Sequence, residues 1–433
     1  MGRRIAADGE HRGPPRRLER KDQRVGPATA ILMLALTTLG YAAQNYEKPI
    51  PPEEPSIGYW ADDAPDGVVG RRQELGRLAS SDDAREALAR ILDVLEVPVS
   101  SQMLVFSKTS LQRGLISPRN PRAVYFNDEL AVAFVPGSGL VELAAYQPRT
   151  GTRFYSMNWQ TGRIERPPMC LECHAGAASL GIPGMYIGSV ETSPSGRPQY
   201  ANSIVSDPTT PFEQRWGGWY VTGAPTGFRH RGNAVTLDPT SAGLSPSDNL
   251  TSVGSVERFI DASKYATQSS DLTALMVFEH QSLVHNLATR LRWEYRLAAN
   301  ETRDDDRSLR LDALARALVF DEEAALPAPL PGDTPFVREF VERGPKDRKG
   351  RTLRRLNLND RLFEYHLSYL VHTNAIESLP SELHASLFDR ILHVLNERLG
   401  AGEITRTELQ SVVEIAAEIV PNVPSEWRGL AER

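Results

Sequence analysis

The chain has only two cysteines, Cys170 and Cys173, and a histidine follows them directly at position 174. Cys-x-x-Cys-His is the pattern by which c-type haem is attached, because the two thiols add to the haem vinyl groups and the adjacent imidazole can bind the iron. A zinc site would need two further ligands, and a thioredoxin-like site would need a βαβ context that the sequence lacks. An ordinary disulfide followed by a chance histidine remains the alternative. The motif therefore predicts one covalent haem c, with His174 as the proximal iron ligand.

A basic N-terminal stretch precedes an uncharged apolar run at residues 28–43. This run has the length of a secretory signal core and is shorter than the ~20 residues that comfortably span a bilayer. Small residues at Gly40 and Ala42 suit cleavage after Ala42, and an uncleaved N-terminal membrane anchor is the alternative. In either case the basic flank stays inside and the body is exported. We therefore expect a periplasmic or other extracytoplasmic protein, in the compartment where haem c is attached.

Composition excludes some classes of function. The chain of 433 residues is 40% hydrophobic and 24% charged, with a formal net charge of −6. Loss of the basic leader would make it more acidic still, which argues against a nucleic-acid partner. Its length exceeds that of a minimal haem-binding bundle and indicates two or three subdomains.

The pattern along the chain predicts an α+β fold. Short β-prone runs at 123–127, 130–136, 140–146 and 153–158 are separated by turn-forming residues, which predicts an antiparallel meander leading into the haem segment. A helix is expected at 82–96, with Ser80 and Asp83 as a capping box. The divisions that we expect are a leader or anchor (1–43), a proline-rich surface tether (44–67), an α+β subdomain (68–165), the haem attachment and pocket segment (166–260) and a helical C-terminal subdomain (261–433).

Helical periodicity dominates the C-terminal third. An apolar stripe begins after Asp271, and further helices are expected at 309–323, 335–343, 361–379, 381–399 and 407–420. Thr405 and Glu408 form a second candidate capping box. A basic run at 346–355 is expected to be a solvated loop, with a propionate clamp or a docking patch as alternatives.

The sixth position of the iron has several candidate ligands. His280 comes first because it lies in the apolar stripe of a predicted helix, which is a rigid mount for a ligand. His230 is second, for its aromatic and arginine surroundings, and Met185 is third because it is close to the motif. An open sixth site is the further alternative. Closed His/Met ligation favours electron transfer, whereas an open site allows chemistry on small molecules.

Several segments together resemble a family of large bacterial cytochrome c domain-containing proteins. They are residues 117–128, the motif at 170–174, residues 216–223, and the residues 279–281 and 285–286. The resemblance covers about residues 60–420 and implies an exported protein with a single haem, more than it implies a reaction.

Three classes of function follow from these patterns. The first is electron transfer through the haem iron, with a redox protein or a small molecule as donor and acceptor. The alternatives are a haem-dependent small-molecule oxidoreductase of peroxidase type and a haem-based sensor module. The length favours an enzyme, but c-type peroxidases use two haems and this chain has one motif. A second metal near Glu279, His280 and His285 would restore the enzyme hypothesis.

Overall fold

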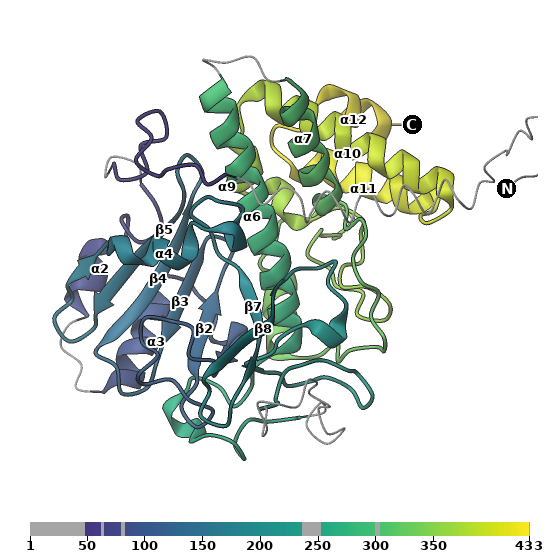
Figure 1. Cartoon of the computed structure of the whole chain (residues 1–433). Helices are drawn as coiled ribbons and strands as arrows, with labels where there is room; N and C mark the ends of the chain where they lie inside the picture. Colours follow the sequence, from purple (N-terminus) through teal and green to yellow (C-terminus); the bar gives the residue numbers. More distant parts are fainter. Residues whose placement is uncertain (1–47, 62–64, 79–82, 236–252, 299–303, 433) are drawn as a thin grey trace, which may run out of the picture. The chain divides into compact units, whose positions relative to one another are not determined.

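A seven-stranded antiparallel sheet forms the N-terminal half of the described residues, in the strand order β6-β5-β4-β3-β2-β1-β9 (Figure 1). The computed structural model describes residues 48–61, 65–78, 83–235, 253–298 and 304–432. The strands are β1 (Met103–Val105), β2 (Arg122–Phe126), β3 (Leu130–Phe134), β4 (Leu140–Gln147), β5 (Gly151–Asn158), β6 (Ile164–Glu165) and β9 (Trp219–Tyr220). A separate hairpin pairs β7 (Ile187–Thr192) with β8 (Pro198–Ser206). The expected meander and α+β class are confirmed.

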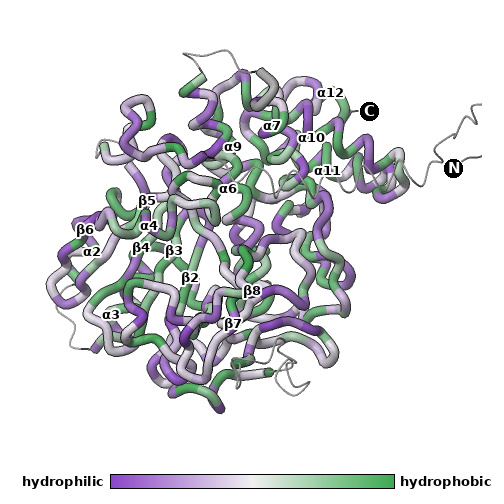
Figure 2. Tube along the Cα trace, in the orientation of Figure 1, coloured by the Kyte–Doolittle hydropathy of each residue, from purple (hydrophilic) through white to green (hydrophobic). Residues whose placement is uncertain are grey.

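The two faces of the sheet pack against different layers. Tyr125, Val132 and Leu143 point to one face and share a buried core with α3 (Ala84–Val94). Phe126, Ala144 and Phe154 point to the other face and share a core with α6 (Leu272–Ala298). Alternate residues of one strand point to opposite faces, so the period-2 pattern fixes which side chains can meet the haem motif. In Figure 2 the apolar stretches follow the central strands and α6.

Helices make up the C-terminal part, as expected. They are α7 (Asp304–Leu318), α8 (Pro335–Glu342), α9 (Asn374–Glu377), α10 (Ser381–Ala401), α11 (Arg406–Ile419) and α12 (Ser425–Ala431). The capping box of Thr405 and Glu408 is present at the start of α11. Before α3, Asp83 caps the helix through the backbone N–H groups of Arg85 and Glu86, while Ser80 lies outside the described residues.

The long helix expected at 361–379 is wrong. This stretch contains a β-bridge between Leu356 and Phe363, a 3-10 turn at 369–372 and the short α9. The Ser368 hydroxyl accepts from the Leu370 N–H, and the Thr373 hydroxyl donates to the Leu370 carbonyl. Such local side-chain bonds compete with continued helix, and they outweigh the apolar spacing here.

The proline-rich segment is bound to the body where it is described. Ile57 and Tyr59 are buried beside Trp293 of α6, and the Ile50 N–H donates to the Gly181 carbonyl just after the haem motif. Residues 48–61 therefore pack on the body and do not form a free surface tether.

The basic run at 346–355 is largely neutralised by acidic partners. Lys349 and Arg351 pair with Glu414 of α11, and buried Arg354 pairs with Asp128 of the β2–β3 turn. The expectation of a solvated loop is wrong for Arg354. The apolar run at 28–43 lies outside the described residues; within them, no helix has the length and hydropathy to cross a membrane.

Candidate functional site

The Cys-x-x-Cys-His motif forms one tight turn of helix. Pro168 to Cys170 adopt a 3-10 turn that runs into α4 (Leu171–His174). Proline suits the first position of such a turn, because its φ is already helical and its missing N–H needs no partner there. Both cysteines are free thiols, Cys170 half-buried and Cys173 exposed. The disulfide alternative therefore has no support in this geometry.

The imidazole of His174 is held on three sides. Its ring lies 4.4 Å from the Phe154 ring of β5 and 5.5 Å from the Tyr186 ring, measured between centroids. Its Nδ1 lies 3.0 Å from the carbonyl oxygen of Gly184, so Nδ1 must carry the proton and donate it. The lone pair is thereby left on Nε2, the nitrogen that can bind iron.

Gly184 is itself fixed by α6. Its N–H donates to the His174 carbonyl at 2.9 Å, so the two residues are joined by a reciprocal pair of hydrogen bonds. Asn286 donates through Nδ2 to the Met185 carbonyl at 2.8 Å. A Cβ at position 184 would lie 2.0 Å from Asn286 Oδ1, so a larger residue there would displace the Asn286 side chain. Asn286 thus helps to position His174 through residues 184 and 185.

Burial sets the protonation of the motif. It lowers the pKa of His174 to about 4, while the bond to the Gly184 carbonyl raises it in part, so the ring is neutral at pH 7. Burial, aided by the charge of Glu142, raises the pKa of the Cys170 thiol to about 11. The site therefore presents a neutral imidazole next to a protonated thiol.

The face of the sheet beside the motif is only partly covered. Ala133, Glu142 and Ser156 are half-exposed there, whereas the opposite face of the same strands is buried. Met169, next to Cys170 in the chain, and Tyr200 of β8 are exposed, at 51% and 66%. Free thiols, a neutral imidazole with an available Nε2 and an open face with small side chains together fit a covalently bound haem.

The first candidate for the sixth ligand lies elsewhere. His280 is buried against the rings of Phe320 and Phe363, and its Nε2 is 2.7 Å from the Ser368 hydroxyl. None of the ring contacts and hydrogen bonds of the described residues joins His280 to His174. The apolar stripe does pack inward as expected, but at His280 it faces the connecting segments that follow α7 and precede α9.

The neighbours of Met185 and His230 show where these two candidate ligands lie relative to His174. Met185 directly follows Gly184, so its backbone lies on the Nδ1 side of His174, away from the Nε2 atom that would bind iron. His230 is buried beside the Trp216 and Phe228 rings, in an aromatic cluster different from that of His174.

The second metal site suggested by the sequence does not form. Glu279 binds Arg215 at 3.1 Å and also accepts from Ser206 and Trp216, while His285 stacks on Tyr146. In the part of the chain that the structure describes, no three His, Cys, Asp or Glu residues are grouped to hold a metal ion. A haem iron needs no such group of protein ligands, because the porphyrin nitrogens supply four of its ligands.

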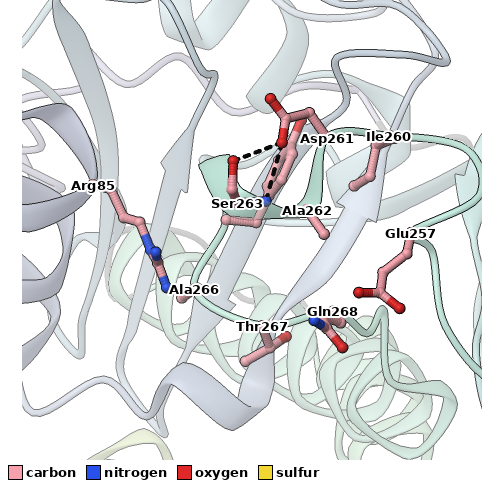
Figure 3. Close-up of a pocket in the computed structure, with 10 residues that line it drawn as sticks. Arg85, Glu257, Ile260, Asp261, Ala262, Ser263, Ala266, Thr267 and Gln268 are labelled. Atoms are coloured by element: carbon pink, nitrogen blue, oxygen red, sulfur yellow. Dashed lines mark hydrogen bonds between the residues drawn. The ribbon is translucent and has the colours of Figure 1, made fainter.

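A cleft of about 730 Å³ opens at a different place, between Arg85 of α3 and residues 257–268 (Figure 3). Its wall is polar, and the N–H and hydroxyl of Ser263 both donate to Asp261. Cys170 and Cys173 do not line it, so it cannot hold a haem that is attached through them.

Sequence reasoning missed the residues that orient His174. Phe154 lies in a predicted strand, and nothing local in the sequence predicts that α6 brings Asn286 close to Gly184 and Met185. Comparisons with known proteins add no further identification: no family model, curated protein or solved structure matches this chain.

Proposed function

We propose that this chain is an exported c-type cytochrome that carries one haem through Cys170 and Cys173, with His174 as the axial iron ligand, and that it transfers electrons. The observation that carries the proposal is the hydrogen bond from His174 Nδ1 to the Gly184 carbonyl, which leaves Nε2 available beside two free thiols. Haem iron bound in this way exchanges one electron between Fe(III) and Fe(II).

Each residue of the site has a role in that proposal. Cys170 and Cys173 anchor the group, Phe154 and Tyr186 hold the imidazole plane, and Gly184 fixes its tautomer. Hydrogen bonding to Nδ1 raises the basicity of Nε2, which strengthens the iron bond. Exposed Cys173 leaves an edge of the site accessible to a redox partner, as electron transfer requires.

A second candidate function is the binding or oxidation of a small molecule at the sixth position of the iron. It is favoured by the engagement of His280 with Ser368 and by the place of Met185 on the Nδ1 side of His174. The internal segments that the structure does not describe, 62–64, 79–82, 236–252 and 299–303, contain neither histidine nor methionine. A reaction or a sensing role would follow from an open sixth position.

The test begins with the full-length chain, produced together with a cytochrome c maturation system. We expect a haem-stained band on a denaturing gel for the wild-type chain and none for the variant with Cys170→Ala and Cys173→Ala. Stained haem that persists in the double variant, or an unstained but folded and exported wild-type chain, would contradict the proposal.

Absorption spectra with and without carbon monoxide then separate the two functions. A low-spin spectrum that carbon monoxide leaves unchanged supports electron transfer, and a high-spin spectrum that carbon monoxide alters supports the second candidate. His280→Ala, with His393→Ala on the exposed face of α10 as its control, tests the sixth ligand. Because His280 is bonded to Ser368, we expect the same spin state in both variants.

A further inference from the structure

An ion pair lies on the half-open face of the sheet, beside the haem motif. Phe154, which touches the His174 ring, pairs with Ala144, and two residues along the strands Ser156 pairs with Glu142. Glu142 in turn faces Ala133 of β3, and Arg122 lies on the same face at the start of β2. Register therefore places one acid and one base on the surface next to the ligand histidine.

The arginine of this pair is incompletely bonded. Arg122 Nη1 donates to Glu142 Oε2 at 3.0 Å, with the two side chains 21% and 25% exposed. Its Nε is buried and has no hydrogen-bond partner. A buried donor without an acceptor costs about 1–3 kcal/mol, so this position favours an added anionic oxygen.

Three other basic residues, Arg231, Lys349 and Arg351, are already engaged. Arg231 Nη1 donates to the Asn202 carbonyl, and Lys349 and Arg351 pair with Glu414. Arg122 combines a place beside the motif with an unused N–H group. A planar guanidinium suits a carboxylate because it can donate two parallel hydrogen bonds.

We propose that Arg122 binds a haem propionate carboxylate through its unused N–H groups, with Glu142 holding the guanidinium in place. This inference rests on the proposed covalent haem at Cys170 and Cys173. In that arrangement the positive charge of Arg122 stabilises the reduced iron relative to the oxidised iron, because Fe(III) carries one more positive charge than Fe(II). Glu142 has the opposite effect.

The experiment compares Arg122→Gln with Arg163→Gln, each in the haem-loaded full-length protein. Arg163 pairs with Glu165 at the exposed edge of the same sheet, so it controls for loss of one arginine charge. We expect Arg122→Gln to lower the midpoint potential and to shift the propionate-bending band in resonance Raman spectra, with haem still covalently bound. Glu142→Gln should raise the potential, and Arg163→Gln should leave both readouts unchanged.

Two outcomes overturn different claims. If the wild-type chain carries no covalent haem, the proposed function fails and this inference fails with it. If haem is attached but Arg122→Gln matches the wild type in potential and Raman band, only the role of Arg122 is wrong. If the glutamine variant folds poorly, Arg122→Lys provides a second test, because it keeps the positive charge and removes the planar pair of N–H groups. We expect its midpoint potential to stay near the wild-type value and its propionate Raman band still to shift.

Discussion

At the scale of single residues, the orientation of His174 depends on a glycine ten positions later. Gly184→Ala would bring a methyl group against the Asn286 amide, and that amide would have to shift away from its hydrogen bond with the Met185 carbonyl. We expect a loss of about 1–3 kcal/mol in unfolding free energy, typical of overpacking, together with less covalent haem per chain. Chemical denaturation and haem staining measure the two effects.

Gly176→Ala is the matched control for that substitution. It lies in the same loop, and a Cβ there would have no atom within 4 Å. A Gly184→Ala protein as stable and as fully loaded with haem as Gly176→Ala would show that the contact with Asn286 does not position His174.

The residues of the proposed haem site form a short sequence motif, whereas the residues that orient His174 do not. Cys170, Cys173 and His174 lie within five positions of one another, so the proposal can be made from their spacing alone. Phe154, Gly184 and Asn286 lie on three elements whose meeting depends on how α6 packs on the sheet. His280 is a similar case. The helical periodicity correctly predicts that its side chain is buried, but it cannot predict that its neighbours are Phe320, Phe363 and Ser368.

At the scale of elements, α6 packs its polar as well as its apolar side chains against the sheet. His285 stacks on Tyr146 of β4 at a centroid distance of 4.0 Å, and its Nε2 is buried without a hydrogen-bond partner. Burial is the main cause that lowers the pKa of His285, to about 3. The charge of Asp128 raises this pKa in part, and His280 lowers it further. The packing of this helix thus keeps a histidine neutral.

This packing predicts a pH dependence. Below pH ~6.5 the unfolded chain binds a proton at His285 and the folded chain does not, so stability falls as pH drops toward about 3, by up to about 1.4 kcal/mol per pH unit. His285→Phe keeps a ring against Tyr146 and cannot be protonated. Urea midpoints measured from pH 7 to pH 4 should therefore fall less steeply in this variant.

His393→Phe on α10 is the control, because His393 is exposed and its removal should leave the slope unchanged. His366, whose pKa burial lowers to about 4, keeps part of the slope in every variant. A His285→Phe protein with the wild-type pH dependence would mean that His285 is accessible to protons in the folded state.

The strands and most helices could be predicted because each has a regular local pattern. Turn residues at hairpin spacing mark the ends of β2 to β5, and the Thr405–Glu408 capping box marks the start of α11. The segment 361–379 was assigned wrongly because apolar spacing cannot reveal that the Ser368 and Thr373 hydroxyls bond to nearby backbone groups.

At the scale of the whole described body, the β2–β3 turn joins the sheet to the C-terminal helices. Gln281 of α6 donates to the Asn127 carbonyl, Arg354 pairs with Asp128, and Asn374 donates to Glu129 at 2.6 Å. Arg354 is 1% exposed and lies over the rings of Phe340 and Tyr369. Sequence reasoning read this arginine as part of a solvated run, because its partner lies more than two hundred residues away.

Removal of that partner tests how strongly the two parts depend on each other. Asp128→Ala leaves a buried guanidinium without its carboxylate, and breaking a pair of this kind typically costs about 3–5 kcal/mol, here reduced because Asp128 is partly exposed. We expect a clear fall in the urea midpoint, measured by tryptophan fluorescence. Asp333→Ala, which breaks an exposed pair with Arg338, should change it little. Equal midpoints for the two variants would show that Arg354 finds other compensation and that the turn is not the main junction.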